Sequence, residues 1–346
     1  MYNNNTSVTK TLAAIVLVMA SAASQAAENK LVMCIYDPLG TRGDAYGFAK
    51  DYVLQMPKFG ITKPVELKVY TNEAVVAEDF KAGQCDAAAM STLRARQFNR
   101  FTGSLDSIGA VPSYKHLSAV LQTLARPEMA KYMVNLDYEV VGMIPLGAAY
   151  IMVGDRSINT LAKAAGKKVA VLDFDKSQAK LVQQIGAQPV SVDLSTIAGA
   201  FNNRQVDIVA GPAVIYKPLE LHRGMTDAAG NARGAVVRFP LLQVTATLVV
   251  NRKKFDNPAA NQKIREYVAS QLQTAYNYVN QSEKEIPAKY WMEVPDSDKP
   301  GYQKLMRESR IMLTKDGTYD KAMMSLLKRI RCKIEPTNYE CSLNDE

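Results

Sequence analysis

The chain has 346 residues, of which 47% are hydrophobic and 22% are charged, and these are the proportions of an ordinary globular protein. The formal net charge is +8, but lysine and arginine are spread along the chain instead of being gathered in one tail. This pattern predicts a solvated basic surface, which would favour anionic ligands by long-range steering. The sequence contains no nucleic-acid recognition module, so we do not expect the protein to bind nucleic acid.

The N-terminus has the layout of a secretory signal peptide. One cation, Lys10, precedes an apolar run at residues 12–20, and small residues follow up to Ala26. We therefore predict a signal peptide over residues 1–26, cleaved near Ala26, and a periplasmic mature protein. An uncleaved membrane anchor is the alternative, but the run is much shorter than the ~20 residues that a bilayer span needs. No later segment looks able to span a membrane, so we expect a protein that does not itself cross one.

Four cysteines form an even set, which in an oxidising compartment allows three disulfide pairings. We favour Cys34–Cys85, because these cysteines lie in two predicted strands that could be neighbours, and Cys332–Cys341, which would close a short loop. A metal site is the competing interpretation. No CxxC pair is present, and the only two histidines lie in unrelated segments, so we expect no metal.

The first half of the mature chain alternates predicted strands and helices. An apolar run at residues 31–36 predicts a buried parallel strand, and a turn at residues 37–43 leads into a helix with apolar positions from Ala45 to Met56. Strands are predicted at residues 65–70 and 86–90, with a helix at residues 72–82 between them. This βαβαβ order predicts a parallel sheet with helices on its faces.

A second βαβαβ unit begins at Lys167. Its strands are predicted at residues 168–172, 189–192 and 206–210, with a helix that ends at Gly186 and another over residues 195–202. The segment FKAGQCDAAA at residues 80–89 parallels FNNRQVDIVA at residues 201–210, with four identities in ten positions. We interpret the shared Phe and Asp as structural, because the Phe can pack a helix on the sheet and the Asp opens the next strand.

About 320 residues after the signal peptide are more than one hydrophobic core usually serves, so we expect two domains. Strands predicted at residues 138–144, 148–153 and 241–250 could carry the chain between them and act as hinges. We predict an α/β fold of the two-lobed, periplasmic-binding-protein-like type II class. Lobe I would comprise residues 28–144 plus 241–256, and lobe II residues 145–240. A helical region at 257–346, with one long helix from Ile264 to Val279 and another around Leu326, would pack across the lobes.

The residues resemble the AdeT family of solute-binding proteins, through residues 34–46 (CIYDPLGTRGDAY), 78–101, 146–172, 183–192 and 331–342. A more distant similarity, through residues 161–171 (LAKAAGKKVAV), 201–212 and 250–255, is to the DctP-like extracytoplasmic receptors of TRAP transporters. The resemblance implies a two-lobed receptor. TRAP receptors typically hold a ligand carboxylate with an arginine, and the matching position here is Ala170. Either another cation serves, or the ligand is not a simple carboxylic acid.

Ligands of open α/β sheets bind outside the carboxyl ends of the strands, so we expect the site there. The amides of the Gly40–Gly43 loop could hold an anion at the start of the following helix, or that loop could be an ordinary connection. Asp173 and Asp175 could do acid–base work, but Asp175 or Ser177 is better interpreted as a helix cap. The candidate ligand-binding residues are Asp37, Leu39, Thr41, Arg42, Asp44, Ser91, Thr92, Arg94, Tyr150, Asp173, Phe174, Lys176, Ser177, Pro212, Tyr216 and Gln243.

GxSxG, P-loop, GxGxxG and HExxH motifs are all missing, so we predict neither an enzyme nor a cofactor. The favoured function is a periplasmic receptor that captures a small molecule, which could be anionic, in an interdomain cleft and presents it to a membrane transporter. Some AdeT family members carry an RND-type efflux label. The alternative is therefore a soluble periplasmic accessory or adaptor of a drug efflux system.

Overall fold

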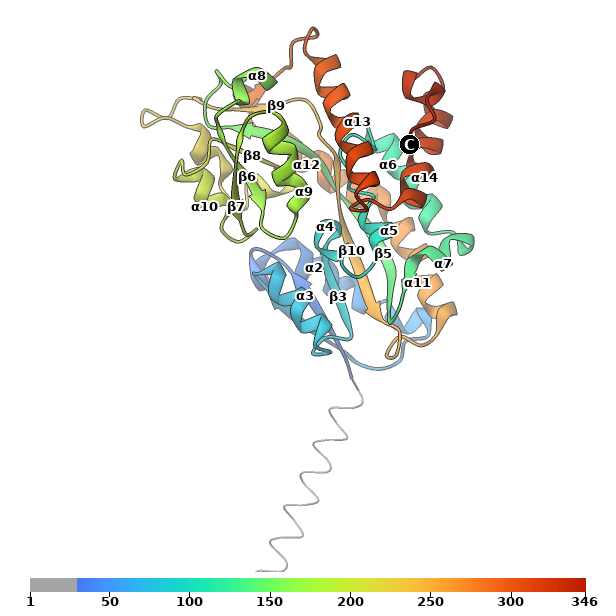
Figure 1. Ribbon diagram of the computed structural model, residues 1–346. Helices are drawn as coiled ribbons and strands as arrows, with labels where there is room; N and C mark the ends of the chain where they lie inside the picture. The colour runs from blue at the N-terminus through green and yellow to red at the C-terminus, as the bar shows by residue number, and fades with distance from the viewer. Residues whose placement is uncertain (1–29) are drawn as a thin grey trace, which may run out of the picture.

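The computed structural model describes residues 30–346, so the predicted signal peptide lies outside the described residues. The first βαβαβ unit is confirmed: strand β1 is hydrogen-bonded in parallel to β2 on one side and to β3 on the other. Apart from short 3-10 turns, it consists of β1 (Leu31–Tyr36), α2 (Asp44–Val53), β2 (Val65–Tyr70), α3 (Glu73–Lys81) and β3 (Ala87–Ser91). This unit forms the blue and cyan part of the molecule (Figure 1).

The second unit repeats this arrangement in the green and yellow part of the molecule (Figure 1). Strand β6 is parallel to β7 on one side and to β8 on the other, as the sequence predicts. The unit consists of β6 (Lys168–Leu172), α9 (Lys176–Gln184), β7 (Gln188–Val192), α10 (Ile197–Asn202) and β8 (Ile208–Pro212).

The repeated Phe and Asp do the same structural work in both units. Phe80 and Phe201 are each 1% exposed and lie in the two cores. Asp86 accepts a hydrogen bond from the backbone N–H of Val32 at 2.8 Å, and Asp207 accepts one from Lys168 at 2.8 Å. Each carboxylate thus ties the start of the third strand to the start of the first, which confirms the structural interpretation of this motif.

Two long strands join the units. Strand β10 (Gln243–Asn251) lies between β3 and β5 (Tyr138–Val153) and is antiparallel to both, while the far half of β5 pairs with β8. The strand order is therefore β2-β1-β3-β10-β5-β8-β6-β7, and β5 is the strand that the sheets of the two units share. Short strands β4 (Val134–Asn135) and β9 (Ala235–Val237) also pair with β5, and β11 (Trp291–Met292) pairs with β9.

The prediction of two strands around Pro145 is wrong, because β5 is continuous through a bulge. The register of β5 against β10 shifts between Val244, which lies opposite Gly147, and Thr245, which lies opposite Pro145. Pro145 has no N–H to donate, and Gly147 has a φ of +110°, which only glycine adopts readily. The strand therefore bends at the boundary between the units without ending.

The single long helix predicted from Ile264 to Val279 is two helices, α11 (Pro258–Ser270) and α12 (Leu272–Lys284), which meet at Gln271. Both pack on β5, one on each side of its bend. A Cβ at Gly142 would lie 2.9 Å from Val268 of α11, and one at Gly147 would lie 3.0 Å from Val279 of α12. Glycine thus allows both helices to approach the strand closely, and the helix break follows the bend of the strand.

Further helices cover the side of the first unit where β5 and β10 run (Figure 1). Their apolar side chains form one core, which includes Leu117, Val120, Leu313, Met323 and Leu327. The helices are α6 (Tyr114–Leu124), α13 (Lys299–Lys315) and α14 (Lys321–Ile334), with the shorter α4 (Thr92–Ala95), α5 (Arg100–Gly103), α7 (Ala130–Met133) and α8 (Leu161–Ala164) elsewhere in the chain. No helix within residues 30–346 is both long and apolar enough to cross a membrane.

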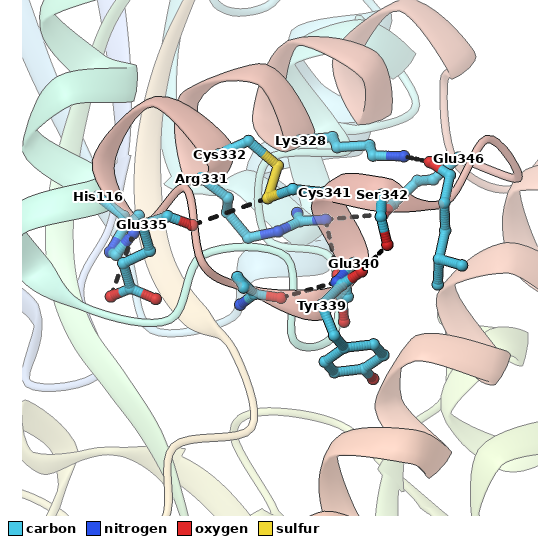
Figure 2. The surroundings of a disulfide bond; sticks show 12 residues. His116, Lys328, Arg331, Cys332, Glu335, Tyr339, Glu340, Cys341, Ser342 and Glu346 are labelled. Atoms are coloured by element: carbon cyan, nitrogen blue, oxygen red, sulfur yellow. Dashed lines mark hydrogen bonds and ion pairs between the residues drawn. A yellow bond between two sulfur atoms is a disulfide. The ribbon is translucent and has the colours of Figure 1, made fainter.

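Both favoured disulfides are confirmed. Cys34 and Cys85, with Cα atoms 5.8 Å apart, fasten β1 to the turn before β3, and both are fully buried. Cys332 and Cys341 join α14 to the C-terminal turn, with Cα atoms 5.6 Å apart (Figure 2).

The segment closed by the second disulfide is also held by buried ion pairs. Arg331 donates to Glu340 at 2.9 Å and to Glu346 at 2.7 Å (Figure 2). Arg310 of α13 pairs with the same two carboxylates. Burial alone would raise the pKa of Glu346, but the hydrogen bonds and charges of Arg310 and Arg331 outweigh it and hold that pKa below its ordinary value. The C-terminal segment is therefore attached to α13 and α14 by buried ion pairs as well as by the disulfide.

A buried polar cluster ties the loop after α5 to β10. Asp106 accepts hydrogen bonds from the N–H of Thr245 at 2.9 Å and from its hydroxyl at 2.6 Å. That hydroxyl also lies 2.7 Å from Thr92, whose own hydroxyl is 2.6 Å from Thr247. Burial raises the pKa of Asp106 to about 7, against the opposing effect of the Thr245 hydrogen bonds and the Arg96 charge.

Replacing both cysteines of a pair with alanine should destabilise the protein in proportion to the closed loop. Loss of Cys34–Cys85, which spans 51 residues, should lower the free energy of unfolding by about 4 kcal/mol, and loss of Cys332–Cys341, which spans 9, by about 2.5 kcal/mol. Urea titrations of the two double variants measure this difference. A larger loss from the C-terminal pair would show that packing outweighs chain entropy here.

The raised pKa of Asp106 predicts a pH-dependent loss of stability. Below pH 4 the carboxyl is protonated in both folded and unfolded states, whereas between pH 4 and 7 only the folded state keeps the proton. The free energy of unfolding of the natural protein should therefore fall relative to Asp106→Asn, by roughly 2 to 4 kcal/mol between pH 4 and 8. Denaturant titrations at several pH values test this; parallel curves would contradict it.

Candidate ligand-binding cleft

A cavity of about 740 Å3 lies where the strand ends of the two units meet. The first unit contributes the ends of β1 and β3, the second unit the ends of β6 and β8, and the bend of β5 with the start of β10 lies between them. Helices α12 and α13 complete the wall. The partly exposed apolar lining side chains include Leu39, Phe48, Ile144, Leu146, Leu194, Val214, Ile215 and Leu242. Its size is that of a typical small-molecule site.

Six of the sixteen candidate residues line this cavity. They come from both units, as expected for strand-end loops: Asp37, Leu39, Asp44, Ser91, Ser177 and Pro212.

Asp37 fills the place where an anionic ligand was expected. Its carboxylate accepts hydrogen bonds from the N–H groups of Leu39 at 2.9 Å and Tyr46 at 3.1 Å, at the start of α2. A Cβ at Gly43 would lie 1.7 Å from this carboxylate, so glycine is required there. The chain itself therefore supplies a carboxylate to one amide at the start of this helix, and an anion bound by the amides of the Gly40–Gly43 loop stays a prediction.

The other ten candidates do not line this cavity. Thr41, Arg42, Asp173 and Lys176 are exposed on the loops that follow β1 and β6. Thr92, Tyr216 and Gln243 are buried in the interior. Phe174 and Arg94 stack on each other between the units. Tyr150 packs edge-on against Trp291, with ring centroids 5.1 Å apart.

Arg94 is a buried cation at the junction of the units. It lies on α4, which Figure 1 shows between the two units, and only 9% of its side chain is exposed. Its guanidinium stacks 3.5 Å from the ring centroid of Phe174, and Nη2 lies 3.9 Å from carboxylate oxygens of Asp173 and Asp193, which follow β6 and β7. Nε lies 3.5 Å from Glu73 on its own side. One cation thus faces three carboxylates, two of them from the second unit.

Arg96 makes a parallel contact across the junction. Its Nη1 lies 3.6 Å from Asp175 Oδ2, while its Nε donates to the backbone oxygen of Gly103 at 2.9 Å. Asp175 also caps α9 by accepting a hydrogen bond from the N–H of Ser177 at 3.1 Å. This geometry confirms the helix-cap interpretation, and a carboxylate with these partners is poorly placed for acid–base work.

A second hollow of about 920 Å3 lies on the other side of these arginines. Five cations line it: Lys81, Arg94, Arg96, Arg100 and Lys131. The acids on its wall are Glu78, Asp175 and Asp320. Leu93 and Asp175 belong to both walls, so they separate this basic hollow from the apolar cavity.

The bend of β5 is fixed by a hydrogen-bonded group that sequence reasoning missed. Glu283 of α12 accepts hydrogen bonds from the hydroxyls of Tyr114 at 2.5 Å and Tyr150 at 2.9 Å, and the Tyr114 hydroxyl accepts one from the N–H of Ala148 at 3.0 Å. Asp106 was missed as well. Tyr114 lies in α6, Glu283 in α12 and Asp106 in the loop after α5, so nothing in the linear sequence brings them together. An isolated acid in an apolar stretch was the available signal for Asp106.

Comparison with known proteins identifies relatives over nearly the whole chain. Residues 5–63 and 60–346 match the family model described as solute-binding protein AdeT 1/2. The probable solute-binding protein AdeT1 of Acinetobacter baumannii is 48% identical over 90% of this chain and its own full length. AdeT2 of the same organism is 32% identical over 70% of this chain and 99% of its own length.

Solved structures with the same fold are TRAP periplasmic solute-binding proteins. One from Desulfovibrio salexigens, with bound orotic acid, has a TM-score of 0.72 at 14% identity and covers 88% of this chain and 99% of its own. One from Haemophilus influenzae, with bound L-gulonate, has a TM-score of 0.69 at 11% identity, over 87% and 99%. The two-lobed type II fold is thereby confirmed. Family and fold are those of solute-binding receptors and not of enzymes, and the chain belongs to the AdeT 1/2 family of solute-binding proteins.

Proposed function

We propose that this protein is a periplasmic receptor that binds a small molecule between its two lobes and presents it to a membrane transporter. The observation that carries this proposal is the cavity of about 740 Å3 whose wall is shared by the strand ends of both units. A solute in this position would contact both lobes at once. Contacts with both lobes are what allow a ligand to favour a closed arrangement over an open one.

The lobes proposed here are residues 28–144 plus 241–256 and residues 145–240, with residues 257–346 packing across them. The chain passes between the lobes on β5 and on the loop into β10. Two crossings with a bulge in the paired strands form a hinge axis, since a strand pair can twist there while its hydrogen bonds are kept.

Relatives and chemistry agree with a receptor in the periplasm. The curated relatives are named as probable solute-binding proteins, and the solved structures of the same fold are periplasmic proteins with a bound solute. The two disulfides are typical of an oxidising compartment. No observation on the described residues favours the efflux-accessory alternative, which needs a protein partner in place of a solute.

A ligand trapped in the cavity should travel with the protein. Native mass spectrometry of the mature protein, purified from periplasm without denaturation, should show a bound small molecule, and its removal should lower the melting temperature. Leu194→Trp places an indole in the cavity and should abolish the bound mass. Leu54→Trp, at a residue that is 72% exposed and off the cavity wall, should keep it. Absence of any solute, with capture of a protein partner, would favour the accessory role.

Arg94 should stabilise the closed arrangement of the lobes. In Arg94→Gln the carboxylates Glu73, Asp173 and Asp193 lose their shared cation, which should cost roughly 3 kcal/mol of local opening free energy. Hydrogen exchange of residues 172–175 and 193–195 should then accelerate about a hundredfold. Arg100→Gln, which removes an arginine that is 60% exposed, should leave these rates unchanged. Equal hydrogen-exchange rates in both variants would show that Arg94 does not stabilise the closed arrangement.

A further inference from the structure

We propose that the cavity is built for an apolar solute that is neutral or positively charged, and that it excludes carboxylates. This inference rests on the proposed receptor function and adds the chemical class of the ligand. It is carried by the charges on the cavity wall, which have one sign only.

Among the described residues, 30–346, no Lys, Arg or His lines the cavity of about 740 Å3. The ionisable acids on its wall are five aspartates: Asp37, Asp44, Asp51, Asp106 and Asp175. The rest of the lining is mainly aliphatic and aromatic. The chain has a formal net charge of +8, but the wall of this cavity carries acidic side chains and no basic ones.

The carboxyl groups of the buried aspartates already have partners within the chain. Asp37 is 2% exposed and accepts two backbone hydrogen bonds, and Asp106 is 1% exposed and accepts two from Thr245. Asp175 is held by Ser177 and Arg96. A carboxylate that entered beside them would lose its water and meet acceptors in place of a cation, which is among the most costly arrangements of charge in a protein.

Two buried arginines at the junction lie outside the lining of the cavity. Arg94 and Arg96 line the basic hollow beyond Leu93 and are engaged with Phe174, Asp173 and the other carboxylates of the junction. They hold the lobes together from the far side of the cavity wall, and neither is among the residues that a solute in the cavity would touch.

The exposed part of the wall, by contrast, suits a positive group. Asp44 and Asp51 lie on α2 with Phe48 between them, and Phe48 is 46% exposed. The Phe48 ring packs edge-on against Tyr278 at 5.7 Å between centroids, and the Tyr278 hydroxyl donates to Asp44 at 2.6 Å. Carboxylates interleaved with aromatic rings stabilise an ammonium group by charge and by cation–π attraction. The apolar interior would take the rest of such a molecule.

Three probes with one naphthalene ring separate charge from shape. We would titrate the mature protein, freed of any bound solute, by calorimetry with 2-(2-naphthyl)ethylamine, 2-(2-naphthyl)ethanol and 2-naphthylacetate at low salt. The amine and the alcohol should bind, and the carboxylate should bind at least tenfold more weakly than the alcohol. Leu194→Trp should abolish binding of the amine and the alcohol, which places both in the cavity.

Charge variants at the mouth provide the second readout. Asp51 makes no ion pair in the structure, and Asp51→Asn should weaken the amine three- to tenfold while leaving the alcohol unchanged. Asp256→Asn makes the same charge change at an exposed aspartate off the cavity wall, so it should affect neither probe.

The outcomes separate this inference from the receptor function. If 2-naphthylacetate, orotate or L-gulonate binds as tightly as the alcohol, and Leu194→Trp removes that binding, the receptor stands and the exclusion of carboxylates is wrong. If Arg94→Gln removes binding of the acid and Leu194→Trp does not, the acid binds in the basic hollow, and the exclusion of carboxylates from the cavity stands. If no probe binds and no solute co-purifies, both proposals fail.

Discussion

The antiparallel pairing of β5 with β10 is the constraint on which the rest of the structure depends. These two strands are the only sheet contacts, within residues 30–346, that connect the strands of the first unit to those of the second. Because β5 is continuous and pairs with strands of both units, it places the strand ends of both units along the wall of one cavity. The bulge at Pro145 and Gly147 sets the bend between them.

Charge is distributed on two sides of this junction. Arg94 and Arg96 line the basic hollow and pair there with carboxylates of the second unit. In the neighbouring cavity, aspartates and tyrosines are the ionisable side chains of the wall. The ion pairs across the junction and the lining of the cavity therefore consist of different residues, apart from Asp175, which belongs to both.

Asp37 places a carboxylate of the chain itself at the start of α2. The start of α2 has the amides and the dipole that bind anions, yet the carboxylate of the chain itself occupies this position. Ala170, the position where the resemblance places a carboxylate-binding arginine, is a small buried residue on the cavity wall. Both features agree with the proposal that the cavity takes a solute other than a carboxylate.

The sequence by itself determined the local elements, because strand and helix periodicity, turn glycines and capping residues act within a few residues of each other. It predicted both βαβαβ units, both disulfides and the structural role of Phe80, Asp86, Phe201 and Asp207. It also predicted a site at the strand ends, where the cavity lies. Only the tertiary structure decided which of those loops line the cavity, because contacts such as Arg94 with Asp193 or Tyr150 with Glu283 join residues about a hundred or more positions apart. Packing likewise decided that β5 is continuous, since a bulge keeps the strand paired through a proline. It also decided the break between α11 and α12, since helices packed on a bent strand must bend with it.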